Sequence, residues 1–227
     1  MSVTPIVFDL EAAGRNANTQ LRVTNTSTGD IPVAISVSEV TMSEAGEVSA
    51  ASADDDFVIF PFQALIPPGA TQVFRVQYVG DPELEASKSY IFSVAQQPVA
   101  LPEGVSGIQI LYNFEVVGSV SPLGGEADLT LLSSELVTND DGTRRAALTV
   151  KNPSNTHAYL SGSRLELTAK DETGEQVWSR SWRPQEIGQT VGVGLVQPGK
   201  DRRFVLPFDL PEGGSSLEAS IRYIGRR

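Results

Sequence analysis

Short runs of alternating hydrophobic and polar residues recur along the whole chain, and helical periodicity is nearly absent. Gly, Pro, Asn and Asp separate these runs, as turn residues separate the strands of a β-sandwich. In the first half the runs predict strands at 4–10, 20–25, 32–40, 57–60, 72–79, 88–96 and 108–117. In the second half they predict strands at 128–137, 145–151, 164–170, 176–182, 194–197, 203–208 and 217–223.

A break at Ser121-Pro122-Leu123-Gly124-Gly125 separates the two sets of strands. Seven strands on each side predict an all-β chain of two immunoglobulin-like sandwiches, with domains at 1–120 and 121–227. Both halves contain a Leu-x-Val-x-Asn strand, at 21–25 and 148–152. We interpret this pattern as two domains of one fold class and not as a functional repeat.

Composition excludes several classes of function. The formal net charge of −11 argues against nucleic-acid binding, which needs clustered Lys and Arg to neutralise phosphates. No apolar run approaches the roughly 18 residues of a membrane span, so no membrane insertion is expected. Because the chain has no cysteine, a disulfide framework, a thiol nucleophile and a thiolate metal site are excluded.

Candidate catalytic and metal-binding groups are sparse. The only histidine, His157, is expected in a turn. The sequence contains neither a G-x-S-x-G nor an H-E-x-x-H motif. Asp54, Asp55 and Asp56 are interpreted as a solvated charge run within an acidic surface loop at 49–56, the best candidate for local disorder. Trp178 and Trp182 are expected to pack in a core. The sequence therefore predicts a protein that is not an enzyme and needs no cofactor or metal.

The segment 60–76 is the most distinctive part of the sequence. Prolines fix φ and disfavour helix before them, so the segment is an extended stretch, a Pro-Pro-Gly turn at 67–69 and a strand. It resembles the P-x-Q-x-L-x-P-G turn that is typical of periplasmic pilus-assembly chaperones of the PapD type. Further matches to that family occur at 90–98, 107–112 and 148–154.

The resemblance implies two immunoglobulin-like domains at an angle, with a cleft between them. It implies a periplasmic chaperone of pilus or fimbria assembly, whose partners are pilin-like subunits and, as a further candidate, an outer-membrane usher. The sequence starts without a signal peptide, so a periplasmic location requires that the leader has been removed. The alternative is a structural or adhesive surface protein that uses the same fold.

In that family the last strand of the first domain completes a pilin subunit that lacks a strand, a form of β-augmentation. Here that strand corresponds to 108–117. The partner-binding residues implied are Ile108, Gln109, Ile110 and Tyr112, with the apolar side chains on one face.

The family also holds the carboxylate at the end of the subunit with an arginine and a lysine. The matching positions here are Pro5 and Gln109, so both cations are missing. A charge-assisted hydrogen bond is roughly twice as strong as a neutral one, so Gln109 is a weak substitute. Arg222 and Lys151 are the candidates for a replacement anchor.

Overall fold

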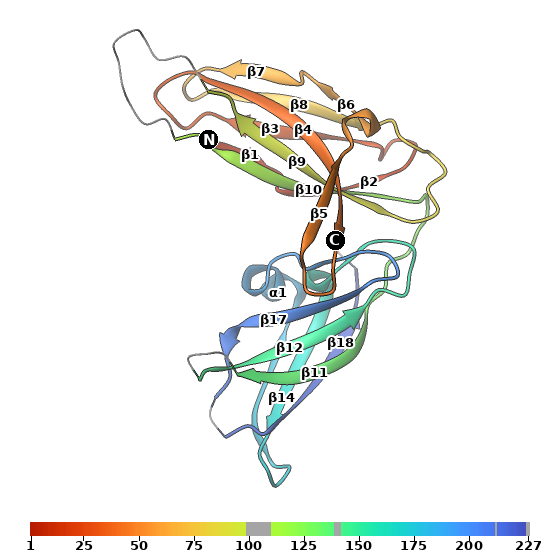
Figure 1. The fold of residues 1–227 in the computed structure, drawn as a ribbon, viewed down its shortest axis with the longest axis vertical. Coiled ribbons are helices and arrows are strands. Elements are labelled where there is room, and N and C mark those ends of the chain that lie inside the picture. The colour runs from red at the N-terminus through yellow and green to blue at the C-terminus, as the bar shows by residue number, and fades with distance from the viewer. Residues whose placement is uncertain (99–109, 139–141, 212, 226–227) are drawn as a thin grey trace. The chain divides into compact units, whose positions relative to one another are not determined.

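A computed structural model of the chain (Figure 1) describes residues 1–98, 110–138, 142–211 and 213–225. The chain divides into two compact units, one formed by residues 1–40 and 49–123 (unit 1) and one by residues 41–48 and 124–227 (unit 2). Most regular elements of the described residues are strands, which confirms the predicted all-β class. The helical elements within these residues are α1 (Pro184–Thr190) and two single turns, η1 (Asp54–Asp56) and η2 (Leu160–Gly162).

Unit 1 consists of two sheets. One sheet has the order β1 (Ser2–Thr4), β3 (Asn18–Thr24), β8 (Thr71–Tyr78), β6 (Phe57–Phe60). The other has the order β2 (Val7–Glu11), β10 (Asn113–Ser121), β9 (Lys88–Gln96), β4 (Ile31–Met42), β5 (Val48–Ser52), and β7 (Gln63–Ile66) also pairs with β4.

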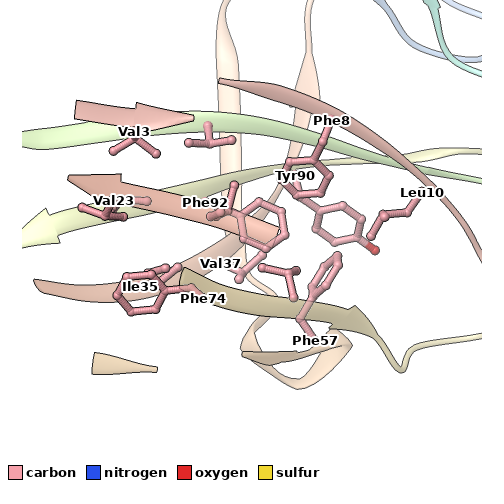
Figure 2. Close-up of a cluster of buried hydrophobic side chains, with 14 of the residues drawn as sticks. Val3, Phe8, Leu10, Val23, Ile35, Val37, Phe57, Phe74, Tyr90 and Phe92 are labelled. Carbon is pink, nitrogen blue, oxygen red and sulfur yellow. The ribbon is translucent and has the colours of Figure 1, made fainter. Parts of the chain in front are cut away.

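The core of unit 1 is built from alternate residues of both sheets, as expected of strands that bury one face. Phe74 comes from the first sheet, Tyr90 and Phe92 come from the second, and all three are fully buried. Phe57 meets the rings of Tyr90 and Phe92 edge-on, with ring centroids 4.8 and 4.9 Å apart (Figure 2). Such edge-to-face contacts fix how the two sheets pack.

Unit 2 also consists mainly of two sheets, with strand orders β11 (Thr130–Thr138), β12 (Arg144–Lys151), β17 (Asp201–Asp209) and β15 (Gln176–Trp182), β14 (Ser163–Lys170), β18 (Ser216–Tyr223). A short pair, β13 (Ala158–Tyr159) and β16 (Leu195–Val196), accompanies them. Leu148 and Leu167 of the two sheets are fully buried in one core. Trp182 is buried there and Trp178 packs beside it with ring centroids 6.1 Å apart, which confirms their core role.

The acidic segment 49–56 is not the loop that the sequence predicts, since it forms β5 and η1. Asp54 Oδ1 accepts a hydrogen bond from the Val37 N–H (2.7 Å), and Asp56 Oδ2 accepts one from the Tyr90 hydroxyl (2.8 Å). Asp54 and Asp55 are exposed, as expected of a solvated charge run, but the prediction of a loop and of local disorder is wrong. Two of its carboxylates satisfy donors of the folded unit, a role that composition does not reveal.

Most predicted strands match a strand of the structure to within a few residues, and two of them differ in a way that matters for the site. The strand expected at 4–10 is divided into β1 and β2, and the two parts join different sheets. The strand expected at 108–117 begins at Asn113 among the described residues and extends to Ser121. Helix α1 was not predicted because Ile187 is the only buried residue among its seven, too few to produce a helical pattern.

The two Leu-x-Val-x-Asn strands end in the same hydrogen-bond arrangement. The Asn25 Nδ2 group donates to the carbonyls of Gly29 (2.7 Å) and Ile66 (2.8 Å). Its Oδ1 atom accepts from the N–H (2.8 Å) and the hydroxyl (2.7 Å) of Ser27. Asn25 is fully buried, so these contacts connect the end of β3 to β7 in the interior of unit 1.

Asn152 repeats this arrangement in unit 2. Its Nδ2 group donates to the carbonyls of Thr156 (2.8 Å) and Val196 (3.0 Å), and its Oδ1 atom accepts from the N–H (3.0 Å) and the hydroxyl (2.7 Å) of Ser154. Ile66 and Val196 each come just before a Pro-Gly turn, at 67–69 and 198–199. The five-residue pattern therefore marks an equivalent structural position in both units.

Asn25→Ala and Asn152→Ala should each destabilise their own unit by about 2–4 kcal/mol, because each leaves buried backbone groups without a partner. Urea unfolding followed by circular dichroism measures the effect. Asn16→Ala is the matched control, since the Asn16 amide makes an exposed hydrogen bond to Glu11 (2.9 Å). Unchanged unfolding midpoints for both buried variants would contradict the structural role.

Candidate functional site

The first half of β10 is paired on one side only. β9 pairs with β10 from Asn113 to Val120, whereas β2 pairs with it only from Val117 to Ser121. Among the described residues, 113–116 therefore have a strand partner only on the β9 side. This half-strand presents an unpaired backbone edge inside an otherwise complete sheet.

The edge is open because the N-terminal segment changes sheets. β1 pairs with β3 in one sheet, and β2 pairs with β10 in the other. The change takes place at Pro5 and Ile6, and Pro5 has no N–H with which to continue a ladder. Just before β2 begins, the Ile6 carbonyl accepts a hydrogen bond from the Val117 N–H of β10 (3.0 Å).

Two hydrogen bonds show which backbone groups of β10 face the open side, that is, the side away from β9. The Tyr112 carbonyl accepts from the Gln96 N–H (2.9 Å) on the β9 side, whereas the Val117 N–H points to the β2 side. Because successive residues of a strand point their backbone groups to alternate sides, Asn113 and Glu115 face the open side. Their N–H and C=O groups are the ones available to an incoming strand.

Apolar side chains accompany this backbone. Val116 is fully buried and Phe114 packs partly on the core, and Tyr112 and Ile110 continue the same phase toward solvent. Ile110 is 72% exposed and Tyr112 is 52% exposed. We call residues 110–116 the β10 edge. It combines unpaired backbone groups with uncovered apolar side chains, the two features that strand addition uses.

The structure places the predicted binding residues as follows. Ile110 and Tyr112 belong to the β10 edge, in the segment just before the strand begins. Ile108 and Gln109 lie outside the described residues. Pro5 lies at the change of sheets. Ile6, the next residue, is 63% exposed, and the sequence analysis did not include it among the site residues. The signal that could have identified it is an apolar residue directly after a proline.

The two candidate anchor cations differ in their surroundings, and both belong to unit 2. The Lys151 ammonium faces Asp201 at 3.9 Å. Arg222 has no ion-pair partner among the described residues, and it lines a cavity together with Arg164 and Arg183. Sequence reasoning missed these two arginines because their proximity depends on strand register.

A charged cluster in unit 1 is structural. The Lys88 ammonium lies 3.0 Å from Glu39 and 3.9 Å from Asp56, and Asp56 accepts the Tyr90 hydroxyl. Burial, together with the hydrogen bond to Asp56, raises the pKa of Tyr90 far above its ordinary value. Tyr90 therefore stays neutral and acts as a hydrogen-bond donor.

The lone histidine lies in the loop before β13, as expected. His157 is buried, and its ring meets the Tyr159 ring edge-on with centroids 5.3 Å apart. Within the described ranges, no three His, Asp or Glu side chains are grouped so that they could hold a metal ion. None of the helices in these ranges has the length and apolar character needed to cross a membrane.

Comparison with solved structures finds likeness along nearly the whole chain. The class 5 fimbriae chaperone CfaA matches with a TM-score of 0.56 at 13% identity, over 98% of this chain and 99% of CfaA. A chain of the chaperone–tip adhesin complex of CFA/I fimbriae biogenesis matches with 0.55 at 15% identity, over 98% of this chain and 97% of that one.

A third similar structure comes from Acinetobacter baumannii. It is a chain of the CsuC–CsuE chaperone–tip adhesion subunit complex of archaic Csu pili, with a TM-score of 0.53 at 13% identity over 95% of this chain and 94% of that one. No protein-family model matches the sequence, and neither does any curated protein. The structural likeness confirms the resemblance at the level of the fold: this chain has the PapD-like fold of fimbrial chaperones.

Proposed function

We propose that this protein is a periplasmic chaperone of pilus or fimbria assembly, which binds subunits by adding the β10 edge to them. The observation that carries the proposal is the half-strand of residues 113–116, whose backbone has one unpaired side, next to the exposed Ile110 and Tyr112. The likeness of the fold to chaperones solved with tip subunits supports it.

In this proposal the subunit contributes a strand to the open side of β10. Its backbone pairs with the N–H and C=O groups of Asn113 and Glu115, which gives affinity without regard to sequence. Ile110 and Tyr112 enter the groove that an incomplete subunit leaves open. Burial of each such side chain is worth about 1.5–3 kcal/mol, so a few of them hold a subunit firmly.

The partners are pilin-like subunits and, for delivery to the surface, an outer-membrane usher. The binding involves no covalent step and requires no cofactor. Because Pro5 and Gln109 carry no charge, the affinity depends on backbone pairing and apolar contact and should respond only mildly to salt.

Glu115→Pro should abolish subunit binding while the chain still folds. Proline removes the N–H that faces the open side and leaves the pairing with β9 in place, as prolines do in natural edge strands. Glu115→Ala is the matched control, because it removes the same side chain and keeps the N–H. Pull-down of a co-expressed pilin-like subunit measures binding, and circular dichroism checks the fold.

If Glu115→Pro folds and binds the subunit as tightly as Glu115→Ala does, the open side of β10 is not the binding edge. Loss of binding by both variants would instead attribute the effect to the Glu115 carboxylate.

Ile110→Glu should weaken subunit binding by at least about tenfold, because a charge would enter an apolar groove. Gln109→Ala should change the affinity by less than about threefold, since it removes at most one neutral hydrogen bond. Amidation of the subunit's C-terminus should also have little effect. Titration calorimetry with the purified subunit gives the three values.

A large loss on amidation would show that a cation still holds the subunit's carboxylate, with Arg222 and Lys151 the first to replace. Unchanged binding by Ile110→Glu would remove the β10 edge from consideration and favour the structural or adhesive role.

A further inference from the structure

Three arginines form a row across one sheet of unit 2. Arg164 of β14 lies directly opposite Arg222 of β18. On the other side of Arg164, β15 ends at Trp182, the partner of Leu165, and Arg183 follows Trp182 directly. Side chains that are directly opposite on adjacent strands lie about 4.5–5.5 Å apart at Cβ, and like charges in such positions repel one another.

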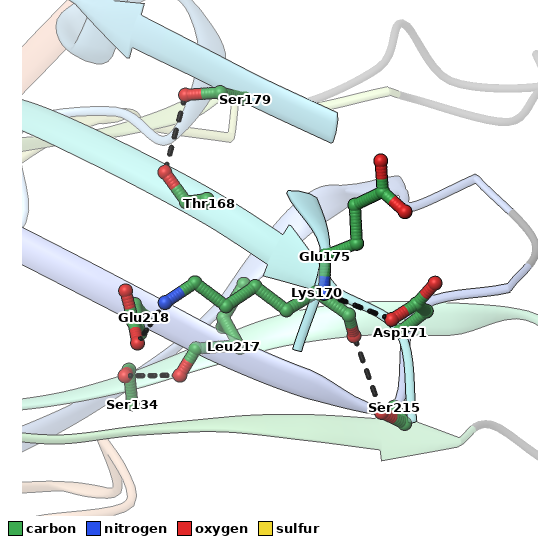
Figure 3. Close-up of polar contacts among 9 residues, drawn as sticks. All are labelled: Ser134, Thr168, Lys170, Asp171, Glu175, Ser179, Ser215, Leu217 and Glu218. Atoms are coloured by element: carbon green, nitrogen blue, oxygen red, sulfur yellow. Dashed lines mark hydrogen bonds and ion pairs between the residues drawn. The ribbon is translucent and has the colours of Figure 1, made fainter. Parts of the chain in front are cut away.

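No ion pair within the described residues involves the row. None of the three guanidinium groups has an ion-pair partner among the described residues, although Lys88, Arg145, Lys151, Lys170 and Arg203 each have one. The far end of the same sheet face is different (Figure 3), since Lys170 pairs with Glu218 there and Thr168 bonds Ser179. Unpaired cations are therefore confined to one end of this face.

Two adjoining cavities surround the row. The three arginines line a cavity of about 820 Å³ together with Glu166 and Glu186. Arg183 also lines a second cavity of about 540 Å³, whose walls include Pro184, Val193 and Ile224. One side of Arg183 thus faces a polar space and the other an apolar one, and both have the size of small-ligand sites.

We propose that the arginine row (Arg164, Arg183 and Arg222) binds a carboxylate attached to an apolar group, with the carboxylate on the row and the apolar group in the 540 Å³ cavity. The guanidinium fork matches the two oxygens of a carboxylate. Three arginines and two glutamates leave one net positive charge in the polar cavity, which suits a singly charged carboxylate better than a doubly charged phosphate.

Such a carboxylate has two sources, a free acid with an alkyl chain or the end of a polypeptide whose last side chain is apolar. The site lies within unit 2 and does not depend on the proposed role of the β10 edge.

Titration of the full chain with octanoate, acetate and octanol tests the proposal. Both tryptophans of the chain pack in unit 2 and Trp182 lines the polar cavity, so tryptophan fluorescence reports binding. We expect saturable binding of octanoate that weakens with salt. Acetate lacks the alkyl chain and octanol lacks the carboxylate, so each should bind at least about tenfold more weakly.

Arg164→Gln and Arg222→Gln should each weaken octanoate binding by about tenfold, since each removes charge-assisted hydrogen bonds. Arg22→Gln in unit 1 is the matched control, because Arg22 is exposed and has no ion-pair partner among the described residues. It should bind octanoate as the unaltered chain does.

Gly188→Leu tests the apolar cavity separately from the arginine row. Gly188 lies in α1 and lines the apolar cavity, where an added Cβ would meet its nearest neighbour, the Ser161 Cβ, at an ordinary 3.7 Å. The variant should therefore fold, fill the cavity and lower the affinity for octanoate. Its effect on acetate should be small, because the arginine row is unchanged.

A peptide that ends in leucine with a free carboxylate, and its amidated form, distinguish the sources. Binding of the free peptide but not the amide identifies a chain end as the ligand, and binding of octanoate alone identifies a free acid. Failure of both to bind overturns the proposal. Equal affinity for octanoate and octanol, or octanoate binding unaffected by both arginine variants, overturns it as well.

Discussion

The change of sheets at Pro5 and Ile6 determines the architecture of unit 1. It gives each of the two sheets a strand from the N-terminal segment, β1 beside β3 and β2 beside β10. The same change prevents β2 from covering β10 before Val117. A closed sandwich and a half-open strand therefore have one cause, a short segment that crosses from one sheet to the other.

The open side of β10 lies on a rigid base. The strand's inner face is held by Val116 in the core, and its other side is paired with β9 along eight positions. Asn25 connects the end of β3 to β7 within the same unit. An incoming strand would therefore meet backbone groups that are already in place, so little ordering entropy is lost on the side of this protein.

Much of the fold could be predicted from the sequence, because a strand with one buried face has a period of two. Residues 88–96 and 163–170 show that period clearly. β5 is exposed along its whole length and so carries no pattern, and the sequence therefore predicts a loop there. Likeness to the fimbrial chaperones is evident in the structure at 13–15% identity, and the short motifs around residues 60–69 were its signal in the sequence.

The candidate site could be predicted only in part. Ile110 and Tyr112 were identified from the resemblance, but the pattern could not show where β10 begins or that β2 covers its second half. The start of β10 depends on its pairing with β9, and the cover by β2 depends on pairing between segments more than 100 residues apart. The arginine row was missed for the same reason, since Arg164 and Arg222 become neighbours only through the register of β14 and β18.

Amide hydrogen exchange measured by NMR tests the central claim most directly, because it reports each backbone N–H separately. In the free chain the amides of Asn113 and Glu115 should exchange rapidly, and those of Phe114 and Val117 should be protected. On addition of a pilin-like subunit, Asn113 and Glu115 should become protected as well. Slow exchange of both amides in the free chain, or rapid exchange that persists in the complex, would contradict the account.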